Sequence, residues 1–322
     1  MVKARLNYCR IGAIHEHAVG KPCPAKIGIA SPLRAQYEAA RCRVARRSRP
    51  RPAHGFSRMN LLLPACLAAA LIAVPHMAQA ASCPRPDALG TARILTVDAK
   101  TTPRVGLKSF PQTLPLADKE VVLTFDDGPL PATTGKILAA LTAECVRATF
   151  FVVGRNAQSL PHMLKTMVRD GHSIGNHTWS HPMLDRIAKD KALADIDKGF
   201  AADDAALAPA QPGTVRLFRF PYFASTPALL ANLESRGVVV FGADLWASDW
   251  LTMTPQQELE LLTTRLAHAR KGIILLHDTK SHTAAMLPAF LRYLKQNGYK
   301  VVHVVPAGSG AGLSPSGKPA TN

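Results

Sequence analysis

The sequence is poor in acidic residues at its start and poor in cysteine and long apolar runs after residue 80. Residues 1–58 carry two acidic residues against 13 Lys and Arg, a net charge of +11, whereas residues 59–322 carry a net of +6. A basic segment without pattern is typical of solvated or disordered chain, so the composition does not predict a nucleic-acid-binding protein. No later run is long enough to cross a bilayer, which excludes a membrane span beyond residue 80.

Residues 59–80 have the pattern of a secretory signal peptide. Arg58 and Met59 precede an apolar run over residues 61–74, and Ala78-Gln79-Ala80 is a small-x-small cleavage pattern. We therefore expect an exported protein, periplasmic or extracellular. Translation then starts at Met59 and residues 1–58 are a non-native or disordered extension; the alternative is a long N-terminal region with an uncleaved anchor.

Cleavage after Ala80 leaves only Cys83 and Cys145. Export permits a disulfide between them, and two unpaired thiols are the alternative. Residues 81–118 are rich in Pro, Thr and Lys and are interpreted as a leader on the domain surface, whereas the Gly/Ser/Pro-rich residues 307–322 indicate a disordered tail. Residues 119–306 remain as one catalytic domain.

This domain alternates short apolar runs with helix-like segments. The expected strands cover residues 121–125, 149–153, 172–175, 217–220, 238–241, 272–276 and 300–304. The expected helices cover residues 133–143, 158–169, 185–207, 226–236, 255–269 and 283–297. Several runs are apolar without alternation, as strands buried on both faces are. The alternation predicts an α/β fold, either a (β/α) barrel or a doubly wound parallel sheet.

Polar clusters follow five of the expected strands, where barrel enzymes collect catalytic residues. The clusters are Asp126-Asp127, Asn176-His177 with His181, Arg219 to Tyr222, Asp249-Trp250 and His277-Asp278.

The four-residue spacing of His177 and His181 suits two ligands of one metal ion. A third ligand would come from Asp127 or Asp126. The alternatives are two surface histidines and an Asp-Gly-Pro turn.

The motifs TFDDGP, HTWSH, RFPY, SDW and LLH occur in that order. Together they resemble the polysaccharide deacetylase family, the chitooligosaccharide deacetylase homology domain of carbohydrate esterase family 4, over residues 120–304. The resemblance implies a single catalytic domain folded as a distorted (β/α) barrel with about seven parallel strands. It also implies metal-dependent removal of acetyl groups from N-acetylhexosamine polymers.

Position by position, the resemblance implies that Asp127, His177 and His181 bind one divalent metal. Two histidines and one aspartate suit zinc, and cobalt, nickel or manganese would also bind. The resemblance also implies that Asp126 is the general base, oriented by Arg219, and that His277 is the general acid, tuned by Asp249. It implies that the Tyr222 backbone N–H contacts the oxyanion and that Trp250 and Leu275 form a pocket around the acetyl methyl.

The chain departs from the family pattern at two places. Phe223 stands where the family often has glycine, and Trp246 stands where it has aspartate, with Asp244 two residues earlier. These aromatic rings either stack on sugars or pack within the protein. The remaining histidines of the domain are expected to be structural: His162, His172, His268, His282 and His303.

The sequence therefore predicts an exported, monomeric deacetylase acting on an N-acetylated glycan, with no nucleic-acid partner. A non-catalytic carbohydrate-binding module on the same fold is one alternative, although both Asp126 and His277 are present. The other is an amidohydrolase or esterase acting on another acylated glycan such as xylan. Chitin oligomers, peptidoglycan and exopolysaccharides all remain open as substrates.

Overall fold

The computed structural model describes residues 85–208 and 215–309, all within one compact unit that covers residues 72–322. The expected extension, signal peptide and most of the tail lie outside the described residues. Cys145 is disulfide-bonded, and Cys83, its expected partner, also lies outside them. No helix of the described part is long and apolar enough to cross a membrane.

The described residues form one sheet whose strand pairs are all parallel. Its main path runs β1-β10-β3-β4-β5-β6-β7-β2, and β9 pairs with β3 and β8. The strands are β1 (Thr91–Val97), β2 (Arg104–Val105), β3 (Glu120–Asp126), β4 (Thr149–Val152), β5 (Ser173–Asn176), β6 (Arg216–Phe218), β7 (Val238–Phe241), β8 (Leu245–Trp246), β9 (Gly272–His277) and β10 (Lys300–Pro306). The fold is the expected distorted (β/α) barrel.

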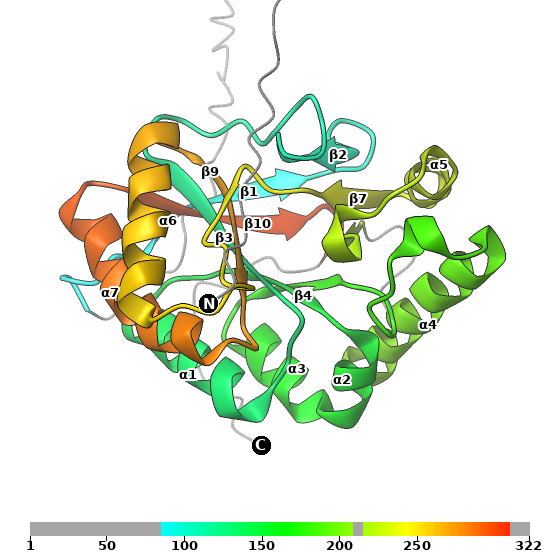
Figure 1. Cartoon of the computed structure of the whole chain (residues 1–322), viewed down its shortest axis with the longest axis horizontal. Helices are drawn as coiled ribbons and strands as arrows, with labels where there is room; N and C mark the ends of the chain where they lie inside the picture. Colours follow the sequence, from blue (N-terminus) through cyan, green and yellow to red (C-terminus); the bar gives the residue numbers. More distant parts are fainter. Residues whose placement is uncertain (1–84, 209–214, 310–322) are drawn as a thin grey trace, which may run out of the picture. The chain divides into compact units, whose positions relative to one another are not determined.

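Helices follow most of the strands and lie outside the sheet (Figure 1). They are α1 (Pro131–Ala143), α2 (Gly154–Ser159), α3 (Pro161–Arg169), α4 (Lys189–Leu207), α5 (Pro227–Ser235), α6 (Pro255–Ala269) and α7 (Ser281–Gln296), with single turns η1 (Leu184–Arg186) and η2 (Pro221–Phe223). Helix α6 begins with a capping box, in which Thr254 and Gln257 each accept the other's backbone N–H.

Two sequence-based expectations need correction. The single helix expected over residues 158–169 is wrong, because Pro161 begins a new helix and separates α2 from α3. The leader segment also contributes two strands that were not expected, β1 along β10 and β2 along β7.

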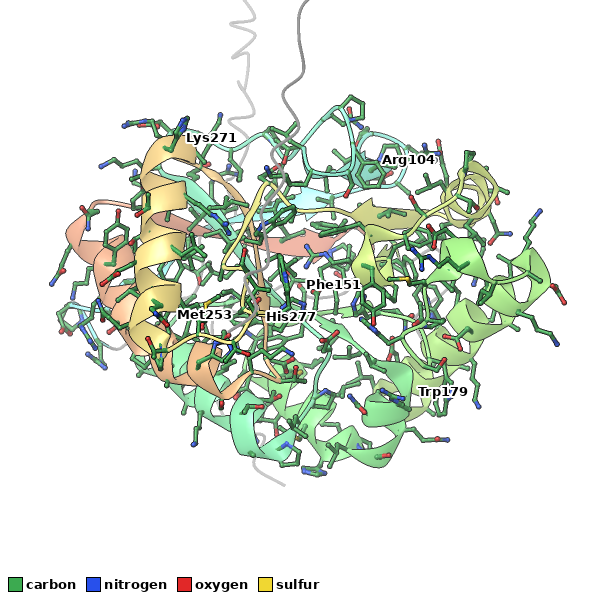
Figure 2. All side chains as sticks on the ribbon, viewed as in Figure 1. Arg104, Phe151, Trp179, Met253, Lys271 and His277 are labelled. Carbon is green, nitrogen blue, oxygen red and sulfur yellow. The ribbon has the colours of Figure 1, made fainter. Side chains whose placement is uncertain are left out.

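Alternation along β3 decides what faces the barrel interior. Val121, Leu123 and Phe125 pack in the outer core against the helices, whereas Val122 belongs to the inner core. Successive strand residues point to opposite faces, so Asp126 lies on the inner face with Val122. The inner core also contains Phe151 (Figure 2), which packs 5.5 Å from Phe241. The interior is thus apolar along the strands and becomes polar where β3 ends.

Candidate active site

A cleft of about 460 Å³ opens at the carboxyl ends of the strands. It is lined by Asp126, Asp127, His177, His181, Phe220, Tyr222, Phe223, Trp246, Trp250, Leu275, His277 and Lys280. Eight of the ten residues implied by the motifs therefore line one cleft. The other two, Arg219 and Asp249, are fully buried directly behind it.

The loops of this cleft hold their backbone in an unfavourable conformation. Ten non-glycine residues of the described part have a left-handed φ, and six of them belong to the motif loops. These six are Asp127, Thr178, His181, Tyr222, Phe223 and Ser248. Such conformations cost free energy and persist only where the surrounding structure enforces them, as is common at functional sites.

Asp126 ends β3 with one carboxylate oxygen engaged by Arg219. Nη1 of Arg219 donates to Oδ1 of Asp126 over 2.7 Å and to Thr124 over 2.8 Å. Nη2 donates to the Gly242 carbonyl, and the guanidinium lies over the Phe151 ring. Because neither charged side chain is more than 4% exposed, this pair fixes the Asp126 carboxylate and leaves Oδ2 for the cleft.

His277 ends β9 opposite Asp126, its register partner on β3. Its Nδ1 lies 2.8 Å from Oδ1 of Asp249, and its backbone N–H donates to Oδ2 over 2.6 Å. Burial alone lowers the pKa of His277, but the hydrogen bond and charge of Asp249 outweigh burial and raise the pKa to about 9. The ring is therefore protonated at neutral pH, with Nε2 as the nitrogen not occupied by Asp249.

Asp278 joins the β9 end to the loop after β3. Thr134 donates to its Oδ2 over 2.6 Å, and its backbone N–H donates to the Asp126 carbonyl. Burial raises the pKa of Asp278 to about 7. A Cβ at position 128 would overlap this carboxylate, so Gly128 of the first motif is required by close approach.

Asp127, His177 and His181 bring three donor atoms together. A carboxylate oxygen and one nitrogen from each ring all lie within 4.8 Å of one another. Oδ1 of Asp127 is 3.6 Å from Nε2 of His177 and 3.1 Å from Nε2 of His181. Nδ1 of His177 lies 2.7 Å from the Arg219 carbonyl, which requires the proton on Nδ1 and leaves the Nε2 lone pair facing Asp127.

This trio fits a divalent cation. Oδ1 of Asp127 is buried yet accepts no hydrogen bond, which is costly unless a cation completes it. Burial alone raises the pKa of Asp127, but the adjacent His181 and His177 rings outweigh burial and hold it well below its usual value. Burial also lowers the pKa of His177 and keeps the ring neutral. A carboxylate and two neutral imidazoles are the ligand states that zinc and similar ions require.

Aromatic rings form the rim on the side of β8. Phe223 stacks on Trp246 with ring centroids 6.2 Å apart, and Trp246 meets Trp250 edge-on at 5.7 Å. The Lys108 ammonium lies 5.2 Å from the Trp246 centroid. Tyr222, 61% exposed, packs edge-on against His181. The two departures from the family pattern are thus in contact with each other.

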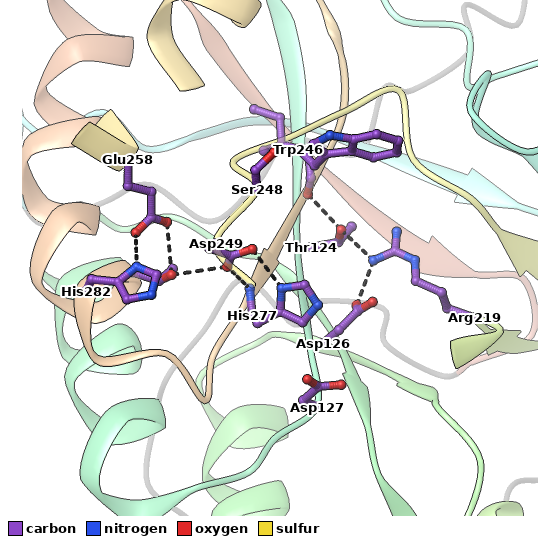
Figure 3. A network of polar contacts seen from close by, with 12 residues as sticks. Thr124, Asp126, Asp127, Arg219, Trp246, Ser248, Asp249, Glu258, His277 and His282 are labelled. Carbon is purple, nitrogen blue, oxygen red and sulfur yellow. Dashed lines mark hydrogen bonds and ion pairs between the residues drawn. The ribbon is translucent and has the colours of Figure 1, made fainter. Parts of the chain in front are cut away.

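Sequence reasoning missed a polar chain behind His277 (Figure 3). Glu258 of α6, which is fully buried, contacts His282 and Thr283 of α7. His282 had been expected to be merely structural. One signal was present: Glu258, Leu262 and Leu266 occupy one stripe at four-residue spacing, which puts an acidic residue on the buried face of α6. Phe220 and Lys280 of the cleft were also not singled out.

Comparisons with known proteins identify the family. The profile of the family described as polysaccharide deacetylase matches residues 114–241. The chain is 30% identical over 203 residues to a chitooligosaccharide deacetylase of Bradyrhizobium sp. (strain ANU 289), covering 58% of this chain and 90% of that protein. It is 32% identical to the peptidoglycan-N-acetylmuramic acid deacetylase PdaC of Bacillus subtilis, covering 60% of this chain but only 39% of PdaC.

Solved structures give the same result. A peptidoglycan deacetylase of Bdellovibrio bacteriovorus superimposes with a TM-score of 0.60 at 31% identity, covering 71% of this chain and 63% of that one. The Bacillus subtilis PdaC structure superimposes with a TM-score of 0.52 at 31% identity, covering 58% of this chain and 88% of that one. Because the sequence matches 90% of the Bradyrhizobium protein at 30% identity, and solved deacetylase structures share the fold, the chain belongs to the polysaccharide deacetylase family of carbohydrate esterase family 4.

Proposed function

We propose that the protein is an exported, metal-dependent deacetylase that hydrolyses the N-acetyl amide of N-acetylglucosamine-containing glycans to acetate and a free amine. The observation that carries this proposal is the pairing of Asp126 with His277 at the ends of adjacent strands, beside the Asp127, His177 and His181 donors. Hydrolysis of an amide needs a base for water and an acid for the departing nitrogen. A binding module needs neither.

Asp127, His177 and His181 would hold the cation, with zinc as the best match for two imidazoles and one carboxylate. When bound, such an ion supplies Lewis-acid polarisation of the acetyl carbonyl and a lower pKa for water. Oδ2 of Asp126 takes a proton from the attacking water as the new carbon–oxygen bond forms. Arg219 occupies Oδ1 and prevents the carboxylate from rotating away.

His277 completes the reaction. Asp249 binds Nδ1, so Nε2 delivers its proton to the amide nitrogen as the carbon–nitrogen bond breaks. The nitrogen leaves as a neutral amine instead of an unstable anion. The proposal assigns the Tyr222 backbone N–H to the oxyanion, a contribution of about 3 kcal/mol for one such donor. Leu275 and Trp250 line the cleft where the acetyl methyl would lie.

Export is supported by the pattern of residues 59–80 and by relatives named for peptidoglycan and chitooligosaccharide deacetylation. Those glycans lie outside the cytoplasm. The same proposal includes a catalytic domain over residues 119–306. It also includes a monomeric protein. N-terminal sequencing of the exported protein tests the cleavage near Ala80. A mature start within residues 1–58 would overturn the signal peptide.

Acetate release tests the activity. The purified protein, loaded with zinc, is incubated with chitin oligomers, peptidoglycan, acetylated xylan and N-acetylated exopolysaccharide, and released acetate is quantified. Release from N-acetylated glycans and not from xylan is expected. Release from xylan alone would make the protein an esterase. Glycan binding without any release would support the binding-module alternative.

A further inference from the structure

A buried polar chain continues from His277 into the protein and ends at His282 (Figure 3). Asp249 is fully buried and receives His277 on both of its oxygens. Oδ2 of Asp249 also lies 3.1 Å from the Thr283 hydroxyl, and the same hydroxyl lies 2.9 Å from Oε1 of Glu258. Oε2 of Glu258 lies 2.7 Å from Nδ1 of His282. The cleft chemistry described above uses none of Thr283, Glu258 and His282.

The Thr283 hydroxyl determines which groups donate and which accept along this series of hydrogen bonds. A hydroxyl has one proton and can donate it to one acceptor only. If Asp249 and Glu258 were both ionised, one of the two carboxylates would face a lone pair of the Thr283 hydroxyl. All three residues are fully buried. Burial of an unpaired carboxylate is strongly unfavourable. One of the two acids must therefore carry a proton and donate it to Thr283.

Glu258 is the better candidate for that proton. Asp249 already accepts two N–H donors from His277, and such donors favour an ionised carboxylate. Glu258 has one other partner, His282. Burial raises the pKa of Glu258; the hydrogen bond with His282 opposes the rise, and the charge of Asp249 adds to it. His282 with a proton on Nδ1 donates to Oε2, which leaves the carboxyl proton on Oε1.

The charged groups around the chain are few. Those facing His277 are Asp249 from the segment after β8, and Asp126 and Asp127 from the end of β3. Asp278 follows His277 in sequence and is bound to Thr134. Those facing Glu258 are Asp249 and His282. Among the described residues the side chains that hydrogen-bond the Glu258 carboxylate are His282 and Thr283, and no lysine or arginine does.

We propose that Glu258 is a protonated, neutral acid that donates to Thr283, and that Thr283 in turn donates to Asp249 and sets the acid strength of His277. Glu258 and Thr283 are positioning residues under this proposal, which rests on the role proposed above for His277. A donor on Oδ2 of Asp249 spreads the carboxylate charge and weakens its pull on the Nδ1 proton. Without that donor, Asp249 holds the proton more strongly and His277 becomes a weaker acid. A weaker acid protonates the leaving nitrogen less readily.

The first experiment measures the pKa of His277 directly by NMR titration of its ring in the metal-free full chain, with no substrate. Thr283→Val is nearly isosteric and removes the hydroxyl; we expect it to raise the pKa of His277 by roughly 0.5. Thr283→Ser keeps the hydroxyl and should keep the wild-type pKa. Thr263→Val is the matched control, because Thr263 bonds only backbone carbonyls on the surface of α6. An unchanged His277 pKa in a folded Thr283→Val protein would overturn the proposal.

The second experiment tests the proton on Glu258 and does not depend on the Thr283 variants. Glu258→Gln places an amide that can donate to Thr283 and accept from His282, so it reproduces the protonated acid. The infrared band of a protonated carboxylic acid should be lost in the Gln variant relative to wild type, while the pKa of His277 stays unchanged. Absence of that difference band, or a fall in the His277 pKa, would show that Glu258 is ionised and overturn the proposal.

Activity gives the third readout. Thr283→Val should lower kcat for acetate release about 2-fold to 3-fold with KM unchanged, and Thr283→Ser should restore it. A loss that Thr283→Ser does not restore would contradict the hydroxyl's role. If the wild-type protein releases no acetate from any glycan, the proposed function fails, whereas the NMR and infrared results still decide the state of Glu258. The two proposals therefore fail separately.

Discussion

Arg219 donates to Asp126 over 2.7 Å inside the barrel, and neither side chain is more than 4% exposed. The guanidinium is matched on several sides, by Asp126, Thr124 and the Gly242 carbonyl. Removing one member of such a pair leaves the other charge buried without a partner, which costs far more than the net contribution of the intact pair. The pair therefore links the integrity of the barrel to the orientation of the proposed base.

Arg219→Ala should lower the free energy of unfolding by about 3–5 kcal/mol, because Asp126 is left buried and unpaired. Urea denaturation followed by circular dichroism measures this change. Arg216→Ala is the control: Arg216 pairs with Asp204 at the same 2.7 Å, but both side chains are close to one-third exposed. Its loss should cost at most about 1 kcal/mol. Equal losses in the two variants would show that burial does not determine the strength of the Arg219 pair.

Asp126→Asn should keep the metal and still fold, with a lower free energy of unfolding because Arg219 loses its buried counter-charge. It should lower kcat by about 100-fold to 10,000-fold, the usual contribution of a positioned base. The carboxylate of the metal trio is supplied by Asp127, and the change is nearly isosteric. His277→Ala should lose a similar factor, and the double variant far less than the product of the two losses, because both groups act in one reaction. Acetate release and metal content are measured on the same preparations. Full activity in Asp126→Asn would reject the base assignment.

His177→Ala should abolish tight metal binding and nearly all activity, because Asp127 and His181 alone form an incomplete site. Metal content after dialysis and zinc titration by calorimetry measure the loss. His268→Ala is the control, since His268 is exposed near the end of α6. A His177→Ala protein that retains a full equivalent of zinc would show that the ligand set is different.

The strands near the site could be predicted because they are continuous apolar runs, and continuous apolar runs are what a sheet covered on both faces selects. Strand β1 could not be predicted in the same way. It pairs only with β10, and six of its seven residues are partly or fully exposed, so no apolar run identifies it. Strands β2 and β8 have two residues each, too few for any period to be legible.

Eight of the cleft residues could be predicted because each stands in a motif that follows a strand, where topology brings the strand ends together. Glu258 and Thr283 could not, because their role depends on how α6 packs against α7 and on which side chain meets Asp249. That packing is a tertiary property with no local motif. The acidic residue within the apolar stripe of α6 indicated a buried carboxylate, but the sequence did not indicate its partners.

Two buried histidines should destabilise the folded state in acid. Burial lowers the pKa of His172 to about 4 and that of His303 to about 3, against 6.5 for an ordinary histidine. At these two sites the unfolded chain takes up protons below pH 6.5 while the folded protein does not, so their contribution to stability is full above 6.5 and decreases as the pH falls towards 4. The decrease is on the order of 3 kcal/mol for His172. Nδ1 of His172 accepts the Ala148 N–H, which requires the unprotonated nitrogen.

His303→Gln, which cannot titrate, should make the free energy of unfolding less dependent on pH between 6.5 and 4. Urea denaturation at a series of pH values gives the slope for wild type and variant. The exposed His268→Gln serves as control and should keep the wild-type slope. The same slope in His303→Gln and wild type would mean that His303 is already protonated in the folded protein.

The pH profile of acetate release should depend on Asp249. His277 must be protonated to act as the acid, and its pKa is raised to about 9 chiefly by Asp249, so kcat should hold below that pH and fall as the pH rises through it. Asp249→Asn removes the charge, lowers the pKa of His277, and should move the alkaline limb to lower pH. Each oxygen of Asp249 accepts one N–H donor of His277. The Asn amide group would replace one of these oxygens with an NH₂ donor that faces a donor, so kcat should drop at every pH. Asp197→Asn, which affects only an exposed pair with Arg236, should leave the limb in place. An unmoved limb in Asp249→Asn would mean that another group controls the protonation of His277.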